Sequence, residues 1–354
     1  VAAHCSKRSG DFTSEEIRFL TSHFPLITIA NGQGSAKYDA LEDGMYQAAR
    51  QLKAASPNTT VLFYWNTFLA YSGYRAYQTF AAHPEWRLSE ADGSRLLVRE
   101  QVETYDLSQP ALRDWWVSVA QTALNQAPFD GIFMDAAIKP VSRQQQAALG
   151  ARRAAAVKSG IEELMEETRA KLGPNAILLY NGLRANLSQA SGNEDTLFLE
   201  HTSGAMLEHF NLVLERDSDG VFDKEDMATN IALIQQAGAR GKIVVVKAWP
   251  GFYQAARIYG GTAPPDNPVA AARKAITFPL ACFLIAAEPY SYFIYTWGYG
   301  DNSGTFEWYP EFDKPLGQPQ GRATQNGWVY TRSFEHAQVR VDLASEQATI
   351  DWQS

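Results

Sequence analysis

The sequence of 354 residues contains only two cysteines, Cys5 and Cys282, and no long hydrophobic run. Two cysteines cannot form a metal site by themselves, and Cys282 lies in an apolar stretch, which favours a buried, unreactive thiol over a disulfide with Cys5. The longest apolar stretch runs from Phe278 to Ala287 and has about half of the ~20 residues that a membrane-spanning helix needs. The sequence therefore predicts a soluble protein with no bound metal and no membrane partner.

Positive charge is also scarce. The chain has 31 Lys and Arg against 39 Asp and Glu, a formal net charge of −8, and its Lys and Arg residues form no long cluster. Nucleic acid and anionic membranes are therefore poor candidates for partners, and a neutral or cationic ligand fits better. The segment Asn31-Gly32-Gln33-Gly34 lacks the third glycine of a dinucleotide-binding turn. We accordingly expect no cofactor.

The chain begins Val1-Ala2-Ala3 rather than with methionine. This start suits either an exported protein after processing or a trimmed chain. An extracellular or periplasmic location is the resulting expectation, and the oligomeric state is left open.

Short apolar runs alternate with helical patterns along most of the chain. Helices are expected over Tyr38–Ala55, Gly73–Ala82, the region of Trp115 and Trp116, Ser142–Leu172, Lys224–Ala237 and Val269–Ala286. Eight runs have the length and composition of strands: Leu26–Ala30, Thr60–Trp65, Val102–Tyr105, Gly131–Met134, Ile177–Tyr180, Thr196–Leu199, Ile243–Val246 and Tyr292–Tyr295. Apolar strands alternating with helices indicate a parallel sheet covered on both faces. Eight such units in about 300 residues predict an α/β fold, the (β/α)8 TIM barrel.

The pattern changes after Trp297. Short alternating runs over residues 328–331, 338–341 and 348–352 are separated by tight turns, which is typical of an antiparallel sheet. We predict a catalytic barrel over residues 1–300 and a small antiparallel β appendage over residues 301–354. The appendage is too short to fold alone, so it is expected to pack on the barrel.

Polar residues and tryptophans follow the predicted strands. In a (β/α)8 barrel the active site forms at the C-terminal ends of the strands, so these residues are the candidates for function. They comprise carboxylates, amides, aromatic side chains and one ammonium group, without a His or Cys pair at metal-ligand spacing: Asn31, Trp65, Asn66, Asp106, Asp135, Tyr180, Asn181, Glu200, His201, Lys247, Trp249 and Trp297.

Carboxylates together with tryptophan and asparagine point to the cleavage of a glycosidic bond. The oxocarbenium-like transition state needs one carboxylate as nucleophile or base and one carboxyl group that protonates the leaving oxygen. Indole faces stack on sugar rings, and amides bind sugar hydroxyls. Asp135 and Glu200, each directly after a predicted strand, form the expected catalytic pair. Glu208, in the same region as Glu200, competes for its role.

Each candidate also has a structural explanation. Asp135 could cap a following helix, and Glu200 could form an ion pair with Lys247. His201 fits a supporting position better than that of a base. Asp106 is expected to fix its own loop rather than to bind substrate. Lys247 is either a ligand or tuning group for a carboxylate or part of a structural ion pair.

Several short motifs lie between Tyr64 and Asp135. They are His83-Pro84-Glu85-Trp86, Asp92-Gly93, Asp106-Leu107-Ser108-Gln109-Pro110, Arg113-Asp114-Trp115-Trp116 and Asp130-Gly131-Ile132-Phe133-Met134-Asp135. This stretch resembles hypothetical glycosyl hydrolase families built on a (β/α)8 barrel. It is similar also to retaining barrel glycosidases whose nucleophile is the aspartate closing strand four and whose acid/base closes strand six. The resemblance implies those roles for Asp135 and Glu200.

Three functions are open at this point. The leading one is hydrolysis of a glycosidic bond in an oligo- or polysaccharide, with about 5–5.5 Å between the carboxyl groups for retention and about 6.5–9.5 Å for inversion. The second is a polysaccharide lyase for uronic acids, in which Lys247, His201 or Tyr180 removes a proton and Asn66 or Asn181 neutralises the substrate carboxylate. The third is a carbohydrate-binding barrel without catalysis. All three imply a carbohydrate partner.

Overall fold

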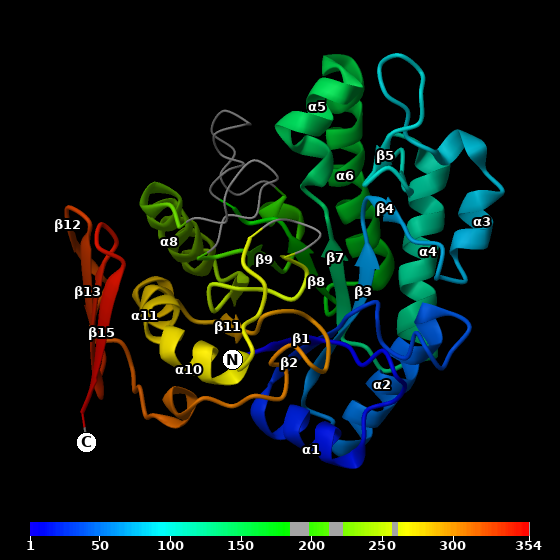
Figure 1. The fold of residues 1–354 in the computed structure, drawn as a ribbon. Coiled ribbons are helices and arrows are strands. Elements are labelled where there is room, and N and C mark those ends of the chain that lie inside the picture. The colour runs from blue at the N-terminus through cyan, green and yellow to red at the C-terminus, as the bar shows by residue number, and fades with distance from the viewer. Residues whose placement is uncertain (185–197, 212–221, 257–260, 354) are drawn as a thin grey trace. The chain divides into compact units, whose positions relative to one another are not determined.

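The computed structural model describes residues 1–184, 198–211, 222–256 and 261–353 (Figure 1). Eight parallel strands form a nearly closed barrel with helices, in the order β1-β2-β3-β7-β8-β9-β10-β11. Their bounds are β1 Ala3–Cys5, β2 Leu26–Ile29, β3 Thr60–Asn66, β7 Gly131–Asp135, β8 Ile177–Asn181, β9 Gly204–Glu208, β10 Ile243–Ala248 and β11 Ser291–Tyr295. The predicted barrel fold is therefore confirmed.

Contacts within the chain group the described residues into two compact units. The N-terminal unit holds residues 3–182 and 198–205, and the C-terminal unit holds residues 1–2, 183–184 and the described residues from 206 to 353. Residues 1–2 belong to the C-terminal unit because the N–H of Ala2 donates to the carbonyl of Phe293 at 3.0 Å. The division at residue 300 stays a prediction.

The N-terminal unit contains five of the parallel strands. Its helices are α1 Ser14–His23, α2 Leu41–Ala55, α3 Tyr77–Ala81, α4 Pro110–Gln126, α5 Arg143–Leu149 and α6 Ala151–Leu172. The single helix expected over Ser142–Leu172 is divided into α5 and α6 at Gly150, which has a φ of 73°. A residue in that left-handed conformation ends a helix, and glycine adopts it without steric cost.

Eight barrel strands agree with the sequence prediction in number, but three assignments differ, one of which, the sixth strand, is described with the site below. Residues 102–105 were expected to form a barrel strand; instead β6 (Val102–Thr104) pairs antiparallel with β4 (Leu69–Ala70) and β5 (Leu97–Val98) in a separate small sheet. The first barrel strand is β1, which has only three residues. One strand is thus lost and one gained before residue 131, so β7 keeps its place as the fourth barrel strand.

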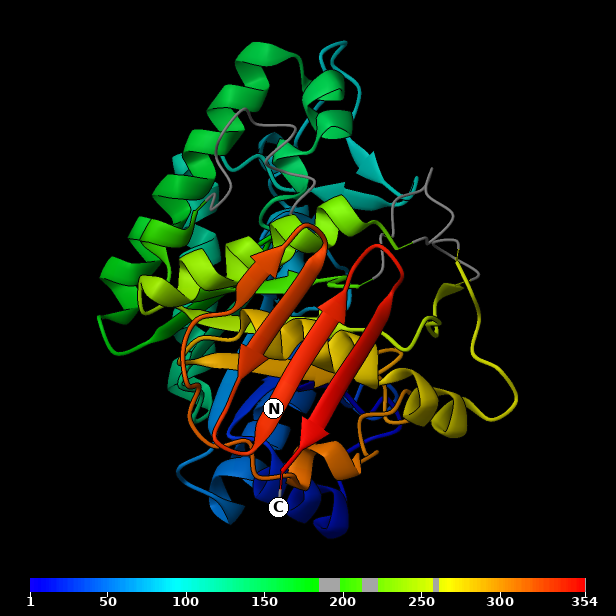
Figure 2. The ribbon, with the colours of Figure 1, turned by 90° about the vertical axis from the view of Figure 1, so that its left-hand side faces the viewer.

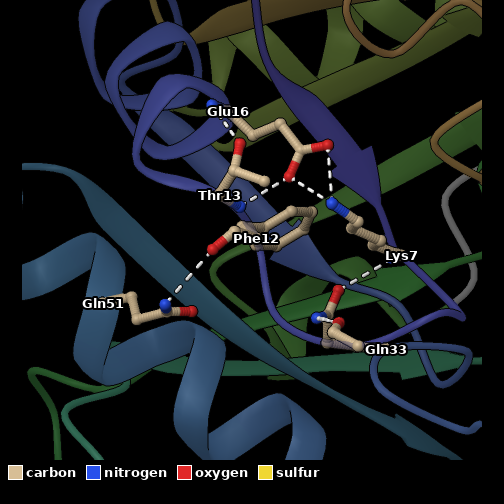
Figure 3. A network of polar contacts seen from close by, with 7 residues as sticks. Lys7, Phe12, Thr13, Glu16, Gln33 and Gln51 are labelled. Atoms are coloured by element: carbon tan, nitrogen blue, oxygen red, sulfur yellow. Dashed lines mark hydrogen bonds and ion pairs between the residues drawn. The ribbon is translucent and has the colours of Figure 1, made fainter. Parts of the chain in front are cut away.

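A polar network fixes the loops that follow β1 and β2 (Figure 3). Thr13 and Glu16 form a capping box at the start of α1, and Glu16 also pairs with Lys7 at 2.8 Å. The buried side chain of Gln33 accepts a hydrogen bond from the N–H of Lys7 and donates one to the carbonyl of Gly10, both at 2.8 Å. The loop after β2 therefore serves to hold the loop after β1 in place.

The C-terminal unit places an apolar helix between two layers. Its helices are α8 Lys224–Ala239, α10 Pro268–Ala275 and α11 Thr277–Ala286. Every residue of α11 from Pro279 to Ala286 is buried. Phe283 packs on Phe293 of β11 with ring centroids 5.0 Å apart, and a four-stranded antiparallel sheet also packs against the helix (Figure 2). Contact with both layers explains the uninterrupted apolar run in the sequence, because a helix covered on all sides is apolar all round.

The four-stranded sheet is the predicted C-terminal appendage, with one strand more than the sequence indicated. Its strands are β12 Thr324–Asn326, β13 Val329–Ser333, β14 Ala337–Asp342 and β15 Gln347–Trp352. The buried Arg332 attaches it to α11 by donating hydrogen bonds to the carbonyl oxygens of Leu284 at 3.0 Å, Ile285 at 3.2 Å and Ala287 at 2.5 Å. These carbonyls lie at the C-terminal end of the helix, where they lack partners within the helix.

The two cysteines and the longest apolar stretch of the sequence both lie in described parts of the structure. Cys5 and Cys282 are both buried and unpaired with each other, which agrees with the expected buried thiol at Cys282. Within the described residues no single helix has both the length and the apolar composition to cross a bilayer; α10 and α11 reach them only as a pair bent by 45°.

Candidate active site

Asp135 is the last residue of β7, and its carboxylate lies at the centre of a cluster of donors from neighbouring strands. The hydroxyl of Tyr64 and the Nδ2 of Asn66 at 3.0 Å, both from β3, donate to Oδ2. The Nδ2 of Asn181, from β8, donates to Oδ1 at 2.8 Å. The next element begins at Lys139 with Ile138 as its cap, so Asp135 does not cap a helix. Three donors fix the orientation of the carboxylate and stabilise its negative charge.

The orientation of the Asn66 amide determines where the proton of Tyr64 lies. Oδ1 of Asn66 accepts hydrogen bonds from the backbone N–H groups of Phe68 at 2.9 Å and Leu69 at 2.6 Å. Its NH2 group must therefore face Tyr64, whose oxygen it reaches at 3.1 Å, and Asp135. Burial and the charge of Asp135 raise the pKa of Tyr64 well above its ordinary value. The phenol keeps its proton and, since its oxygen accepts from Asn66, donates that proton to Asp135.

Trp65 lies on the opposite face of β3 from these donors. Adjacent residues of a strand point to opposite sides, and Tyr64 and Asn66 both point to Asp135. Trp65 is buried, with ring centroids 4.8 Å from Tyr74 and 5.9 Å from Trp116 of α4. The expectation that its indole faces a sugar is wrong, because the strand presents it to the surrounding helix.

The same alternation separates Asn181 from Tyr180 on β8. Asn181 contacts Asp135, while the ring of Tyr180 is buried against Phe198 with centroids 6.2 Å apart. Burial raises the pKa of Tyr180, so its hydroxyl keeps its proton and is not available as a base. Tyr180 therefore faces away from the carboxylate, contrary to the prediction.

The second strand-end carboxylate belongs to Glu208, in the C-terminal unit. Glu208 is the last residue of β9, the sixth barrel strand. Its Oε1 accepts a hydrogen bond from the hydroxyl of Tyr299, and its Oε2 lies 3.6 Å from the Nη2 of Arg184. The side chain retains 15% of its exposure. Glu208 is thus oriented by a phenol and a guanidinium.

Glu200 does not end a strand. It is exposed in a short 3-10 helix, Leu199–His201, that precedes β9. Phe198, just before this helix, has a left-handed φ of 68°, so the chain turns where the sequence pattern suggested a strand over Thr196–Leu199. Residues 196 and 197 lie outside the described residues. The predicted position of Glu200 is therefore wrong, and Glu208 occupies the position assigned to it.

His201 and Lys247 have structural partners. The Nδ1 of His201 lies 3.1 Å from Oε1 of Glu166 on α6, and its predicted supporting position at the active site stays a prediction. Lys247 is fully buried, and its Nζ donates to the carbonyl oxygens of Thr296 and of Ala248 at 3.2 Å. Burial lowers the pKa of Lys247 and the charge of Glu208 raises it, with burial the larger effect. The predicted ion pair between Glu200 and Lys247 is not among these contacts.

Trp249 is covered by side chains of its own unit. His209 stacks parallel to it, with centroids 5.4 Å apart and 17° between the planes, and the Nζ of Lys247 lies 3.4 Å from the indole centroid. Burial lowers the pKa of His209 to about 4, so this imidazole is neutral at pH 7. The indole is 2% exposed, which contradicts its expected role as an open stacking platform.

Trp297 is buried as well, beside Phe252 at 5.8 Å between centroids. Gly304 has a φ of 86°, and a Cβ there would lie 2.6 Å from the Trp297 ring, so only glycine allows this close approach. The segment around Gly304 covers the ring, and Trp297 therefore does not present the stacking face predicted for it.

The remaining candidates lie in loops of the N-terminal unit. Asp106 is buried, and its Oδ1 accepts hydrogen bonds from the N–H and the hydroxyl of Ser108 at 3.2 and 2.5 Å, which agrees with the expected fixation of its own loop. Asn31 is partly exposed in the turn after β2.

Among the residues that the structure describes, no group of three His, Cys, Asp or Glu side chains is arranged to hold a metal.

Comparison with known proteins identifies the family of this chain. Residues 53–338, most of the chain, match the family model described as hypothetical glycosyl hydrolase family 15. The chain belongs to this family. No match was found among the curated proteins. Membership of hypothetical glycosyl hydrolase family 15 implies a carbohydrate substrate, and this member ends its fourth and sixth barrel strands with Asp135 and Glu208.

Solved structures are similar in fold to this member of hypothetical glycosyl hydrolase family 15. The glycoside hydrolase domain of PelA from Pseudomonas aeruginosa matches 83% of this chain and 93% of its own, with a TM-score of 0.50 and 11% identity. The maltogenic alpha-amylase AmyB from Thermotoga neapolitana matches 97% of this chain and 86% of its own, with a TM-score of 0.51 and 11% identity. At this identity the likeness concerns the fold, because one barrel fold hosts many reactions.

Sequence reasoning missed three residues around the carboxylates in this family member: Tyr64, Arg184 and Tyr299. Tyr64 had a usable signal, since it shares the face of Asn66 by period-2 alternation. Tyr299 lies four residues beyond the end of β11, and Arg184 follows β8 in a loop, so neither is marked by a pattern.

Proposed function

We propose that the protein hydrolyses a glycosidic bond of an oligo- or polysaccharide with retention of configuration, and that Asp135 is its nucleophile. One observation carries this proposal: the carboxylate that closes the fourth barrel strand is oriented by Tyr64, Asn66 and Asn181. A nucleophile must be ionised and held in a fixed direction, and three donors supply both conditions.

The reaction has two steps. A carboxylate oxygen of Asp135 forms a bond to the anomeric carbon while the bond from that carbon to the glycosidic oxygen breaks, and the leaving oxygen takes a proton from a carboxyl group. Water then attacks the anomeric carbon, and Asp135 departs as a carboxylate. The second residue, which gave its proton to the leaving oxygen in the first step, takes a proton from this water. One water is consumed, and the two inversions give net retention.

For the second residue we propose Glu208 in place of Glu200. Glu208 ends the sixth barrel strand, which is the position of the acid/base in the retaining glycosidases that the sequence resembles. Glu200 is exposed and precedes that strand. Strand order therefore supports Glu208.

The lyase alternative has less support. It needs amides such as those of Asn66 and Asn181 to neutralise a substrate carboxylate, whereas both amides donate to Asp135. Two of its proposed bases are also engaged elsewhere, since Tyr180 packs on Phe198 and His201 pairs with Glu166.

The test is a panel of polysaccharides and of 2,4-dinitrophenyl glycosides, assayed with the wild type and with Asp135→Asn, Glu208→Gln and Glu200→Gln. Asp135→Asn should lose about 10²–10⁴-fold or more in kcat on every substrate that the wild type cleaves. Glu208→Gln should show a similar loss on polysaccharides but a much smaller one on the dinitrophenyl glycosides, because that leaving group departs without a proton. Glu200→Gln is the matched control and should retain wild-type rates.

Three results would contradict the proposal. Equal activity in Asp135→Asn and the wild type would exclude the nucleophile, and unsaturated products with ultraviolet absorbance would identify a lyase. Binding of a glycan that stays intact on long incubation, unchanged by Asp135→Asn, would identify a barrel without catalysis.

A further inference from the structure

The two oxygens of Asp135 have different surroundings. We propose that Tyr64 and Asn66 are positioning residues that reserve Oδ2 as the non-attacking oxygen, so that Oδ1 forms the bond to the sugar, and that they accelerate the second step of the reaction more than the first. This inference rests on the proposed function and deepens it, because it assigns the atom that reacts and the step that each donor serves.

Oδ2 already accepts two hydrogen bonds of known direction. The amide of Asn66 must present its NH2 group, since its oxygen accepts from the N–H groups of Phe68 and Leu69. The hydroxyl of Tyr64 must donate to Oδ2, since its own oxygen accepts from Asn66. A carboxylate oxygen accepts hydrogen bonds through two lone pairs, and Oδ2 accepts from two donors, Tyr64 and Asn66. Attack by Oδ2 would require breaking one of these hydrogen bonds.

Both donors are held rigidly. Tyr64 is 6% exposed and Asn66 is fully buried. The ring of Tyr64 lies against Phe133 with centroids 6.0 Å apart, and the carbonyl of Asn66 accepts a hydrogen bond from the indole Nε1 of Trp116 at 2.9 Å. Donors fixed in this way are preorganised, so the protein does not have to reorganise to stabilise charge on Oδ2.

The charge on Oδ2 differs between the two steps. When Oδ1 bonds to the anomeric carbon, Oδ2 becomes the carbonyl oxygen of an ester and loses negative charge. When water later displaces Asp135, Oδ2 regains that charge, and the donors from Tyr64 and Asn66 are in place to stabilise it. They therefore favour the leaving carboxylate in the breakdown of the intermediate, as the donors of an oxyanion hole favour developing charge.

Tyr64→Phe tests this assignment, because it removes the hydroxyl and keeps the ring. The probe is the 2,4-dinitrophenyl glycoside that the wild type cleaves fastest, followed by stopped-flow absorbance. Breakdown of the intermediate should slow by about 10- to 100-fold, so that kcat and KM fall together, a burst of dinitrophenolate appears, and kcat/KM stays within about threefold of the wild type. In the intact mass spectrum, the adduct formed with a 2-deoxy-2-fluoroglycosyl fluoride should persist longer than in the wild type.

Tyr74→Phe is the matched control. Tyr74 is a buried tyrosine of the same unit whose hydroxyl donates to the backbone carbonyl of Tyr64 at 3.3 Å and not to Asp135. It should show no burst and no change in adduct lifetime. Asn181→Ala removes a donor from Oδ1 and should lower kcat/KM without slowing breakdown selectively.

The outcomes separate the two proposals. A wild type that cleaves no glycoside and forms no adduct overturns the proposed function and this inference with it. An active wild type in which Tyr64→Phe lowers kcat/KM as much as kcat, or behaves like Tyr74→Phe, overturns the inference alone and leaves the proposed function intact.

Discussion

The hydroxyl of Tyr299 donates a hydrogen bond to Oε1 of Glu208. A donor of this kind stabilises the ionised form of a carboxyl group, so its removal lets the group keep its proton to higher pH. If Glu208 is the proton donor, Tyr299→Phe should move the basic limb of the pH profile of kcat/KM upward by about one pH unit. The profile is measured on a polysaccharide substrate, where the leaving group needs the proton.

Tyr309→Phe serves as the control for that variant. The buried Tyr309 hydroxyl has no hydrogen-bond partner in the part of the chain that the structure describes, so its removal should leave the profile in place. A basic limb that is identical in Tyr299→Phe and the wild type would remove the support for Glu208.

His209 should make the stability of the protein depend on pH. Burial lowers its pKa from 6.5 to about 4, so between these values the unfolded chain binds a proton that the folded chain does not. Above about pH 6.5 the imidazole is neutral in both states and does not lower the stability. As the pH falls from 6.5 towards 4, proton binding by the unfolded chain lowers the free energy of unfolding by up to about 3 kcal/mol. His209→Asn should show a smaller decrease over this range in urea titrations, and asparagine tolerates the left-handed φ of 66° at this position.

His336→Asn is the matched control, because His336 is exposed in the same unit. Its acid sensitivity should equal that of the wild type. The same pH dependence in His209→Asn and the wild type would show that His209 does not cause it.

Arg332 should be required for attachment of the C-terminal sheet. Arg332→Met keeps the aliphatic volume but leaves the carbonyl oxygens at the end of α11 without their donors, and it leaves Glu288, 3.9 Å away, without a cation. We expect a loss of about 3 kcal/mol in the free energy of unfolding by urea. Arg340→Met, at an exposed position on β14, should change it by less than about 0.5 kcal/mol. Equal stability of the two variants would argue against the attachment role.

The two thiols should be unreactive in the folded protein. Burial, with a smaller effect from Glu16, raises the pKa of Cys5 to about 12, and burial also raises the pKa of Cys282. The thiolate is the reactive form, so a disulfide reagent at pH 8 should titrate both thiols in urea and neither under native conditions. Rapid native modification of either cysteine would contradict the burial described above.

The barrel could be predicted from the sequence because its central strands are continuous apolar runs. The first strand could not, since the three residues of β1 are too few to show a pattern. Helix α1 was not predicted, although the Thr13-x-x-Glu16 capping box marks a helix start. The prediction of residues 102–105 as a barrel strand was wrong because a short strand has the same local composition in the barrel and in the separate small sheet of β4, β5 and β6.

The candidate site was partly predictable for a related reason. Asp135 was found because its strand is long and unambiguous. Glu200 and Glu208 each follow an apolar run, and composition alone does not show which run is the strand. Trp65 was misplaced because it and Asn66 were both taken as candidates, whereas adjacent side chains of a strand point to opposite faces and only one of the two can face inward. The partners Tyr64 and Asn66 follow once that face is known.

The sandwiched position of α11 has a consequence for work with shortened chains. A fragment that stops before β12 would leave one side of the apolar stretch Pro279–Ala286 of this helix in contact with water, and such a surface promotes aggregation. Expression trials that trim the polypeptide to its barrel should therefore yield insoluble material, unless the uncovered side of the helix is first rebuilt with polar residues.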